Sequence, residues 1–499
     1  MIKTDADVNW GTRIWNPAAG KLTGWTHAIM IAGALLLLAY LWSSPKIPYN
    51  RGFGWDGVRY ARWVKYLPDD LAAGQINAYY IQRTFPSLLV SIPARVFGLE
   101  VTRDYVIHGF CVANAVCVYL VALFWARVCV ALRVSGSRTL VGLILLAATY
   151  PVLKQSAYSG VLTDLFALAA SAAMLDCWVR DRRLSLATAV LVAMFCWAST
   201  PILGSILLLF PRDSRLSLGR FKRFAEWGPW GLATGFAGAC IFFAVTMFAE
   251  SREVMPVPSW PAFLPVSILI SVTYVWFVAR QIVSVIGEDE GPPQVSGCSR
   301  GRWVAWMLLV PGVIALQRFI APRPFEGTLL MEQFLIGAVT RPGLFLVGDF
   351  SYYGAMVVLG ALFLPALLRA AAGLGLGVLG AVAFGVAMNL YPESRMTLNI
   401  APFFVLPLVL ALPQDRLTAS QWAFVGVCQL LTTKIWLPIT ATVADFGFDR
   451  LLLYPAQYLF MSHGPWMAND AFIVQASVAI IAVAVAWGLF RRQTSGAKN

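Results

Sequence analysis

The sequence predicts an all-α polytopic membrane protein, and composition is the first reason. Of the 499 residues, 59% are hydrophobic and only 13% are charged, with a mean hydropathy of +0.69. A soluble domain carries roughly a quarter charged residues, so this chain has too few to cover a surface in water. No hydrophilic stretch is long enough to fold as a separate soluble domain. The whole chain, 1–499, is therefore expected to form a single transmembrane domain.

The second reason is that apolar windows of about 20 residues recur from end to end, which is the length a helix needs to cross roughly 30 Å of hydrocarbon. About twelve crossings are expected. They lie near 25–44, 104–126, 138–152, 161–179, 228–249, 260–284, 303–321, 352–370, 374–390, 396–413, 421–438 and 471–490.

The third reason is the position of the basic residues, which flank these windows. If the N-terminus is cytoplasmic, the clusters Arg180–Arg183, Arg212–Arg223 and Arg491–Arg492 all lie inside, as the positive-inside rule requires. The net charge of +13 thus indicates membrane anchoring, and no nucleic-acid partner is expected. Polar residues run to about Thr23 with no small-residue cleavage site after them, so a cleavable signal peptide is not expected.

One apolar segment, 184–211, does not fit a single crossing. A single crossing would place the Arg212–Arg223 cluster outside, against the charge rule. Pro201, in "CWASTPILG", also disrupts a continuing helix. The segment is therefore expected to be a hairpin of two half-helices that enters the membrane and returns. Non-helical backbone at that depth must be buried in protein or line a wet cavity.

This topology places most of the polar residues outside the cytoplasm. The external segments are 45–103, Lys154 to Asp164, Glu250 to Glu253, 322–351, Glu393 with Arg395, and 439–470. The cytoplasmic loops are short and basic, apart from "GEDEGPP" at 287–293. Any chemistry is therefore expected on the external face.

The first external loop, 45–103, has the features of an interfacial element. From Asp56 to Tyr66, apolar and aromatic residues alternate with Arg59, Arg62 and Lys65, which predicts an amphipathic helix lying in the interface. Glycines surround Asp56 and allow a sharp turn that points its carboxylate into a cavity. The next apolar segment, "YYIQRTFPSLLVSIPARVFGLE", is too short to span the membrane.

Three stretches resemble the GT-C class of integral-membrane glycosyltransferases, in particular its bacterial members that use polyprenyl-phosphate sugars. They are "WDGVRYARWVKYL…YYIQRTFPSLLVSI", "LTDLFALAASAAMLDCWVRDRRLSLATAVLVAMFCWAST" and "YPESRMTLNIAPFFVLPLVLAL". The first carries an acidic residue in the first external loop beside an interfacial helix, which is the main feature of the resemblance. The resemblance implies a multi-pass protein of the bacterial cytoplasmic (inner) membrane whose active site faces the periplasm.

The resemblance also implies a reaction. Enzymes of this class move a hexosyl or pentosyl group from a polyprenyl-phosphate carrier to a glycan, lipid or protein acceptor, with inversion. A carboxylate must accept the acceptor's proton, and cations must hold the leaving phosphate. Asp56 is the expected base. The expected phosphate ligands are Arg83, Lys434, Lys154, Arg252 and Arg395, and the expected sugar or acceptor contacts are Tyr60, Tyr80, His108 and Glu393.

Several of these residues also have a plain structural interpretation. Asp56 also fits an ordinary solvated charge at the interface, although catalysis is the favoured interpretation, and Lys434, in "LLTTKIWLP", fits a lysine snorkelling to the interface equally well. Glu393 and Arg395 fit a simple loop ion pair, and His108 a packed side chain. The 322–351 loop fits either a cover over the donor or plain packing over the bundle.

The other motifs give no strong indication of a catalytic, cofactor or metal site. "GLGVLG" at 375–380 matches a dinucleotide fingerprint by letter, but no strand precedes it, so close helix packing explains it better. Eight scattered cysteines without CxxC spacing predict neither a disulfide framework nor a zinc site. No cofactor is indicated with certainty. External carboxylates are able to bind Mg²⁺ or Mn²⁺, so metal dependence stays open, although their spacing matches no metal-ligand pattern.

Two other functions compete with glycosyl transfer from a single lipid-linked sugar. One is a polymerase or ligase of the O-antigen type, which is also many-spanned but relies on external arginines and a histidine. The other is a lipid or solute transporter. Transporters usually show repeat symmetry and paired broken helices, whereas this sequence has one broken segment and no repeat.

The topology is testable by cysteine labelling from outside intact cells. A cysteine at position 74, in the 45–103 loop, is expected to react with an impermeant reagent, and one at position 219 is expected to stay unmodified. The parent chain measures the background from the native cysteines. Modification at position 219 but not at position 74 would invert the assignment.

Overall fold

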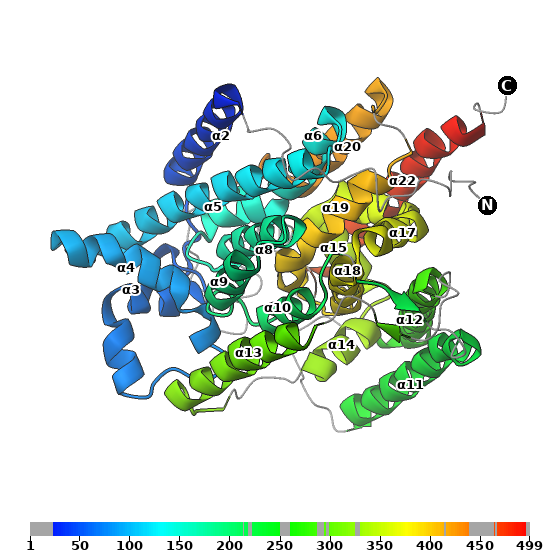
Figure 1. Cartoon of the computed structure of the whole chain (residues 1–499), viewed down its shortest axis with the longest axis horizontal. Coiled ribbons are helices and arrows are strands. Elements are labelled where there is room, and N and C mark those ends of the chain that lie inside the picture. The colour runs from blue at the N-terminus through cyan, green and yellow to red at the C-terminus, as the bar shows by residue number, and fades with distance from the viewer. Residues whose placement is uncertain are drawn as a thin grey trace.

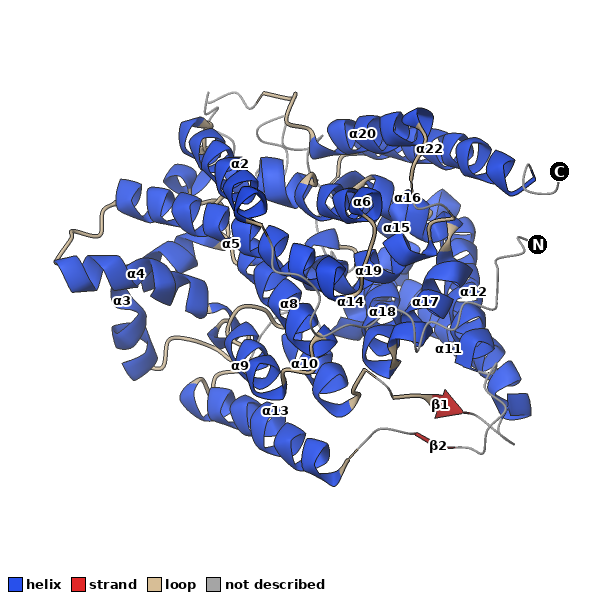
Figure 2. Ribbon diagram, turned by 45° about the horizontal axis from the view of Figure 1, so that its top comes forward, coloured by secondary structure: helices blue, strands red, loops and turns tan. Residues whose placement is uncertain are grey.

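The computed structural model describes residues 23–212, 214–217, 222–249, 260–286, 294–295, 299–324, 330–413, 416–438, 464 and 467–495. These residues form a bundle of helices (Figures 1 and 2). In the first half the helices are α2 (Gly24–Ser43), α3 (Gly57–Ala72), α4 (Phe85–Phe97), α5 (Arg103–Ala131), α6 (Gly136–Ala147), α7 (Ser156–Tyr158), α8 (Asp164–Val179), α9 (Arg183–Ala193), α10 (Thr200–Leu209) and α11 (Lys222–Ala249).

The second half continues in the same manner. Its helices are α12 (Leu264–Ile286), α13 (Arg300–Ile320), α14 (Leu330–Val339), α15 (Leu344–Tyr353), α16 (Ala355–Leu362), α17 (Leu364–Leu374), α18 (Leu376–Met388), α19 (Ala401–Ala411), α20 (Ala419–Thr433) and α22 (Asn469–Ser495). Short helical turns are η1 (Tyr49–Gly52), η2 (Ile81–Arg83), η3 (Pro151–Gln155), η5 (Pro261–Phe263) and η6 (Ser394–Ile400). Two two-residue strands, β1 (Leu216–Ser217) and β2 (Gln294–Val295), pair antiparallel.

The prediction of an all-helical, multi-pass chain is confirmed. Seven helices in the described residues are long and apolar enough to cross a membrane, and up to ten if each of three bent helix pairs is one span. The windows expected near 138–152 and 352–370 are such pairs, bent by 50° and 87°. The expected span near 374–390 corresponds to α18, one of four shorter apolar helices.

The third bent pair lies in 322–351, which the sequence predicts to be an external loop. There α14 and α15 meet at 96°. The break falls at Pro342–Gly343, where Gly343 has a φ of +64° and no helix continues. Most of the 439–470 loop and the region around Arg252 lie outside the described residues.

Burial separates helices that face lipid from those at the centre. In the apolar windows of α2 and α13, 11% and 17% of the residues are buried, whereas the window Ser394–Ala411 is 83% buried. The exposed residues on the outer helices are large and apolar, for example Leu36 and Leu308, both 74% exposed. A contiguous apolar exterior of this kind requires hydrocarbon around it. Figure 1 shows α2, α11 and α13 around a centre that contains α8, α18 and α19.

Helix α8 connects the two faces of the bundle. Fourteen of its sixteen residues are buried, and it packs against α5, α9 and η6. Sixteen residues of α-helix are about 24 Å long. One end carries the buried Asp164, and the other carries Asp176, which pairs with Arg127 and Arg180 at 2.9 Å each.

The segment 184–211 forms α9 and α10, joined by a non-helical turn at 194–199. Eleven and ten residues are about 16 Å and 15 Å of helix, roughly half of the hydrocarbon thickness each. The start of α9 and the end of α10 line one pocket, so the two helices run in opposite directions. The turn between them carries Trp197, which is fully buried. The position of this hairpin in the membrane stays a prediction.

The segment 45–103, which the sequence predicts to be the first external loop, builds η1, α3, η2 and α4. Helix α3 buries Tyr60, Trp63 and Val64 on one side and exposes Arg59 and Arg62 on the other, which is the expected amphipathic pattern. Arg62 forms a bidentate ion pair with Asp70, with N–O distances of 2.7 and 2.8 Å. Helix α4 has thirteen residues, or about 20 Å, which is too short to span.

Candidate active site

A tight turn positions Asp56 at the start of α3. Gly54 has a φ of +75°, and a Cβ at this position would lie 2.9 Å from Ser159 Oγ. At Gly57 a Cβ would lie 2.8 Å from the carbonyl oxygen of Val161, so any larger residue would push α3 away from the bundle. Asp56 is the N-cap residue of α3, but its side chain makes no cap hydrogen bond. The carboxylate points instead toward two arginines.

These arginines belong to a four-residue group, which we call the carboxylate–arginine cluster: Asp56, Arg83, Glu393 and Arg395. Arg395 Nη2 donates to Asp56 Oδ2 at 3.1 Å, and Arg395 Nε lies 3.1 Å from Glu393 Oε1. Arg83 Nη1 lies 4.0 Å from the same oxygen of Asp56. The side chains of Arg83 and Arg395 are 1% and 15% exposed, and that of Asp56 is 24% exposed. The cluster is therefore largely shielded from solvent, and its most accessible side chain among these three is that of Asp56.

Aromatic rings hold Arg83 in place. Its guanidinium carbon lies 4.4 Å from the ring centre of Tyr79 and 4.5 Å from that of Trp197, and Nη1 donates to Tyr60 Oη at 3.2 Å. Within the described residues, Arg83 Nε has no hydrogen-bond partner. Cation–π contacts of this geometry are worth about 2 kcal/mol when desolvated. The arginine is thus fixed, but one donor is left for another ligand.

Arg395 enters the cluster from η6. Two other residues of η6, Asn399 and Ser394, connect this segment to the rest of the bundle. Ser199, in the turn between α9 and α10, hydrogen bonds Asn399 at 3.2 Å, and Tyr353 donates to the carbonyl oxygen of Ser394 at 2.9 Å. Three segments far apart in sequence therefore meet at the cluster: the first external loop, the turn at 194–199 and η6.

The charge of Asp56 is set by these neighbours. Burial alone would raise its pKa, but the positive charges of Arg395 and Arg83 outweigh burial and hold the pKa below the ordinary value of 3.8. The basic residues of α3 itself contribute little to this effect. Arg62 turns away to Asp70, and Arg59, which stacks on Tyr80 at 4.3 Å, contributes less than either arginine of the cluster.

The expected sugar or acceptor contacts are not all in one place. Tyr60 is fully buried and accepts the hydrogen bond from Arg83, and Glu393 is part of the cluster. Tyr80 is half-buried beneath Arg59 and within electrostatic range of Asp56. His108 instead stacks on Trp42, with ring centres 3.8 Å apart, and no described contact joins it to the cluster. For His108 the packed-side-chain interpretation fits better.

Two of the expected phosphate ligands form a separate group. Lys434 is fully buried, with Nζ 4.9 Å from the ring centre of Tyr150 and 3.4 Å from the Ser351 carbonyl oxygen, so it does not snorkel to the interface. Lys154 Nζ donates to the Leu437 carbonyl oxygen at 2.5 Å. The ring of Tyr352 lies 5.6 Å from that of Tyr150, which contacts Lys434. Tyr352 also interacts electrostatically with Asp164 and with Arg395 of the cluster, so it lies between the lysines and the cluster. Arg252 lies outside the described residues.

Three residues near the cluster were not expected from the sequence: Tyr79, Asp164 and Trp197. Asp164 is 4% exposed, and neither of its carboxylate oxygens has a hydrogen-bond partner in the described residues. It interacts electrostatically with Arg395 and Arg83. A lone carboxylate opening the apolar run "LTDLFALAASAA" is costly in a membrane, and that cost is the signal that would have singled it out.

The described residues contain no group of three or more histidine, cysteine, aspartate or glutamate side chains placed to hold a metal ion. The carboxylate–arginine cluster offers its positive charge through guanidinium groups instead. Such an arrangement is able to hold an anion, and it keeps a carboxylate ionised beside that anion.

Comparison with known proteins gives distant structural similarity only. No family model matches the sequence, and no curated protein matches it. The chain is similar in fold to the archaeal oligosaccharyltransferase AglB from Archaeoglobus fulgidus, solved in complex with an inhibitory peptide and a dolichol-phosphate, at 14% identity and a TM-score of 0.39. The apo form from the same organism gives 13% identity and a TM-score of 0.36.

A third structure of the A. fulgidus enzyme, tethered with an acceptor peptide, gives 14% identity and a TM-score of 0.34. Each comparison covers 95% of this chain but only 55 or 56% of the archaeal one. The chain therefore spans about half the length of these proteins. At these scores the similarity assigns no class, no residue and no substrate.

The ion pairs of Asp56 predict how stability depends on pH. Because its folded pKa is lowered, the contribution of its carboxylate is fully present above about pH 3.8 and is lost as pH falls through the lower folded value. The difference in melting temperature between the wild type and Asp56→Asn should stay constant from neutral pH to about pH 4 and shrink below it. In an Arg395→Gln background the folded pKa rises, so the contribution of the carboxylate should be smaller and its loss should be complete at a higher pH. A difference that already changes between about pH 7 and about pH 5 in the wild type would contradict the pairing.

Proposed function

We propose that this chain is a membrane glycosyltransferase that moves a hexosyl or pentosyl group from a polyprenyl-phosphate donor to a glycan, lipid or protein acceptor outside the cytoplasm. The observation that carries the proposal is the carboxylate–arginine cluster. It combines an ionised, partly exposed carboxylate with two guanidinium groups, and it lies where the interfacial helix α3 joins the bundle. The proposed setting is the bacterial inner membrane, with the site facing the periplasm.

In the proposed reaction the cluster performs two tasks. The acceptor oxygen attacks the anomeric carbon, the bond from that carbon to the phosphate oxygen breaks, and the acceptor's proton passes to Asp56. Polyprenyl phosphate leaves as an anion, so negative charge grows at its oxygens. Arginines at that position stabilise the transition state more than the ground state. A single displacement of this kind inverts the anomeric configuration.

Geometry divides the two arginines between these tasks. Arg395 lies between Asp56 and Glu393 and holds both carboxylates. Arg83 is 4.0 Å from Asp56, beyond hydrogen-bonding distance, and its Nε has no described partner. We assign Arg83 to the donor phosphate, because it is rigidly held and its Nε is left without a described partner. Arg395 then keeps Asp56 ionised and orients it.

A largely apolar cavity that reaches η6, the segment that carries Arg395, suits the lipid part of the donor. It has a volume of about 220 Å³ and is lined by α12, α15, α16, α18 and α19, largely with apolar residues such as Phe277, Met356 and Phe404. It reaches Thr397, two residues beyond Arg395 in η6. A polyprenyl chain entering here would bring its phosphate toward the cluster. Lys434 and Lys154 are the next candidates for phosphate contact, and Tyr60, Tyr80 and Glu393 for sugar or acceptor contact.

Purified, reconstituted protein distinguishes this function from the alternatives. Formation of a new glycosidic bond from a single-sugar polyprenyl-phosphate donor supports the proposal. Movement of substrate across the bilayer without bond formation would indicate a transporter. Transfer of preassembled polymer alone would indicate a ligase or polymerase of the O-antigen type.

Removing the basicity of Asp56 should slow transfer without disturbing the fold. Asp56→Asn keeps the shape of the side chain, and loss of general-base catalysis typically costs about 10²–10⁴-fold in rate. Turnover and donor binding are measured separately, and donor binding should stay near the wild-type value. Asp70→Asn is the matched control, because Asp70 lies in the same helix but pairs with Arg62. Wild-type turnover in Asp56→Asn would move the base elsewhere. The next candidates are Asp349, which lines the apolar cavity, and Glu250 and Glu326, which lie outside the described residues.

Loss of phosphate contacts should appear in donor binding. A charge-assisted hydrogen bond is worth about 1.5–3 kcal/mol, so Arg83→Ala and Lys434→Ala should each weaken donor binding by roughly 10- to 100-fold. Arg83→Lys, which keeps the charge, checks for unfolding, and Arg59→Ala controls for charge alone. Donor binding that survives both alanine substitutions in a folded protein would remove these residues from the site and leave Lys154, Arg252 and Arg395.

A further inference from the structure

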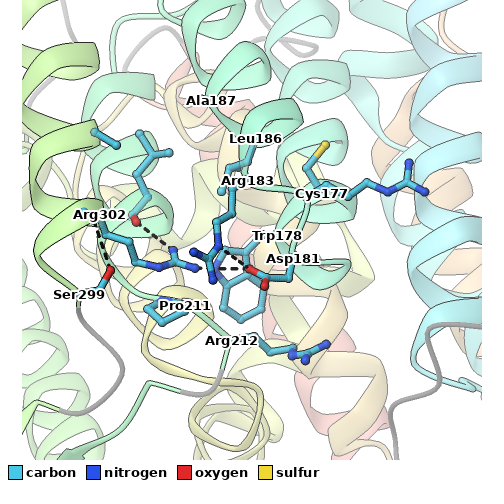
Figure 3. Close-up of a pocket in the computed structure, with 14 residues that line it drawn as sticks. Cys177, Trp178, Asp181, Arg183, Leu186, Ala187, Pro211, Arg212, Ser299 and Arg302 are labelled. Atoms are coloured by element: carbon cyan, nitrogen blue, oxygen red, sulfur yellow. Dashed lines mark hydrogen bonds and ion pairs between the residues drawn. The ribbon is translucent and has the colours of Figure 1, made fainter.

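Two pockets away from the carboxylate–arginine cluster differ in how their carboxyl groups are partnered. The pocket between the ends of α8 and α10 and the starts of α9 and α13 contains Asp181, whose Oδ1 lies 3.4 Å from Arg302 Nη2 and 3.5 Å from Arg183 Nε (Figure 3). The cavity of about 220 Å³ that reaches η6 also contains a carboxyl group, that of Asp349. This second carboxyl group has no hydrogen-bond partner in the described residues.

Asp349 lies on α15 and is deeply buried. The residue is 1% exposed, and both of its carboxyl oxygens lack a hydrogen-bond partner in the described part of the chain. The hydroxyl of Ser394 lies near enough to interact with it, but the geometry is not that of a good hydrogen bond. Among the described residues that line the cavity, none but Asp349 has an acidic or basic side chain. A buried carboxyl group without a partner is costly, so this position requires an explanation.

Asp349 belongs to the polar end of the cavity. Tyr353, one helical turn later, donates to the Ser394 carbonyl oxygen at 2.9 Å, and its hydroxyl lies 2.9 Å from Thr397 Oγ1, so this end adjoins η6. Away from η6 the walls are apolar. Gly360 and Phe404 meet there, since a Cβ on Gly360 would lie 2.6 Å from Phe404 Cζ. A ligand that fits the cavity has an apolar body and a polar head directed toward η6.

The chemistry of a carboxyl group favours hydroxyl groups as that polar head. A carboxylate accepts hydrogen bonds through both oxygens, and a carboxylic acid donates one and accepts others. A hydroxyl group both donates and accepts, so it pairs with either form. A phosphate presents negative charge and acceptor oxygens, which suit the guanidinium groups of the cluster better than a carboxyl group. A bare polyprenyl chain offers no hydrogen-bonding group at all.

We propose that the Asp349 end of this cavity binds hydroxyl groups of a lipid-linked sugar, while the lipid occupies the apolar part. The inference rests on the proposed function, and it adds a contact for the hydroxylated head group that is separate from the phosphate ligands. Two substrates of the proposed reaction carry such a head group, the polyprenyl-phosphate sugar and a glycolipid acceptor. Asp349 would then help to select the sugar, because a site built to hydrogen-bond a hydroxyl group discriminates against ligands without it.

Lipid binding to the full-length protein in nanodiscs tests the inference without turnover. Two pairs of probes are compared: polyprenyl phosphate with and without one glucose, and diacylglycerol with and without one glucose. The wild type should bind the sugar-bearing member of at least one pair more tightly by roughly 10-fold, the effect of one or two hydrogen bonds to a carboxyl group. Asp349→Leu, a side chain of similar size and shape, should abolish this preference, and Asp349→Asn should keep part of it. The pair that responds identifies the donor or the acceptor as the source of the sugar.

The matched control is Val357→Ala, because Val357 lines the same cavity and is apolar. It should weaken binding of both members of a pair equally. Since Asp349 has no described partner to lose, Asp349→Leu should not lower the melting temperature of the ligand-free protein. A lowered melting temperature with equally weakened binding of both members would show a structural role and overturn the inference.

Two further results would overturn it: equal binding of both members of each pair by the wild type, and a sugar preference that survives Asp349→Leu. The proposed function fails by a different result. A wild type that prefers the sugar-bearing lipid through Asp349 but forms no glycosidic bond would contradict sugar transfer and leave the binding site in place.

Discussion

The burial of Arg83 is the constraint on which much of the architecture depends. A guanidinium removed from water costs several kcal/mol unless partners replace its solvation. Here the partners come from three segments: Tyr60 and Asp56 from the 45–103 loop, Trp197 from the turn between α9 and α10, and Met396 of η6, whose Sδ lies 3.8 Å from Arg83 Nη2. If any of these segments moved away, the charge would lose part of its compensation. The packing of these three segments and the geometry of the candidate site therefore have the same physical cause.

The fold class could be predicted from the sequence because the bilayer imposes it. Apolar windows of the required length and basic flanks are local properties, and the helices occur close to the expected windows. What local patterns do not show is where a helix bends. Pro342–Gly343 lies in a segment that looks like a loop, yet helices continue on both sides of it. The bent pair at α16–α17 is another case: Pro365, in the first turn of α17, marks a break but not the angle of 87°.

The site was predictable only in part, for a related reason. Charged residues are rare in an apolar chain, and this made Asp56, Arg83, Glu393 and Arg395 identifiable as candidates. Their pairing was not predictable, because more than three hundred residues separate Asp56 from Arg395 along the chain. Arg62 was the natural partner by proximity in sequence, but its helix turns it to Asp70. Trp197 and Tyr79 were missed because aromatic residues are common in membrane proteins, and only contact with Arg83 distinguishes these two.

Helix α8 carries an aspartate near each end, and the two carboxylates fix the helix along its axis. Asp164 faces the carboxylate–arginine cluster, while Asp176, twelve positions later, is fixed by Arg127 and Arg180 near the other end of the helix. The two carboxylates are about 18 Å apart along the axis. Sliding the helix in either direction would take Asp164 away from the cluster and Asp176 away from Arg127, so both ion contacts oppose it. Insertion of one residue between them would rotate one end by about 100° and shift it by about 1.5 Å, separating one carboxylate from its arginines. The distance between the site and the far end of the helix is thus set by the number of residues in a single helix.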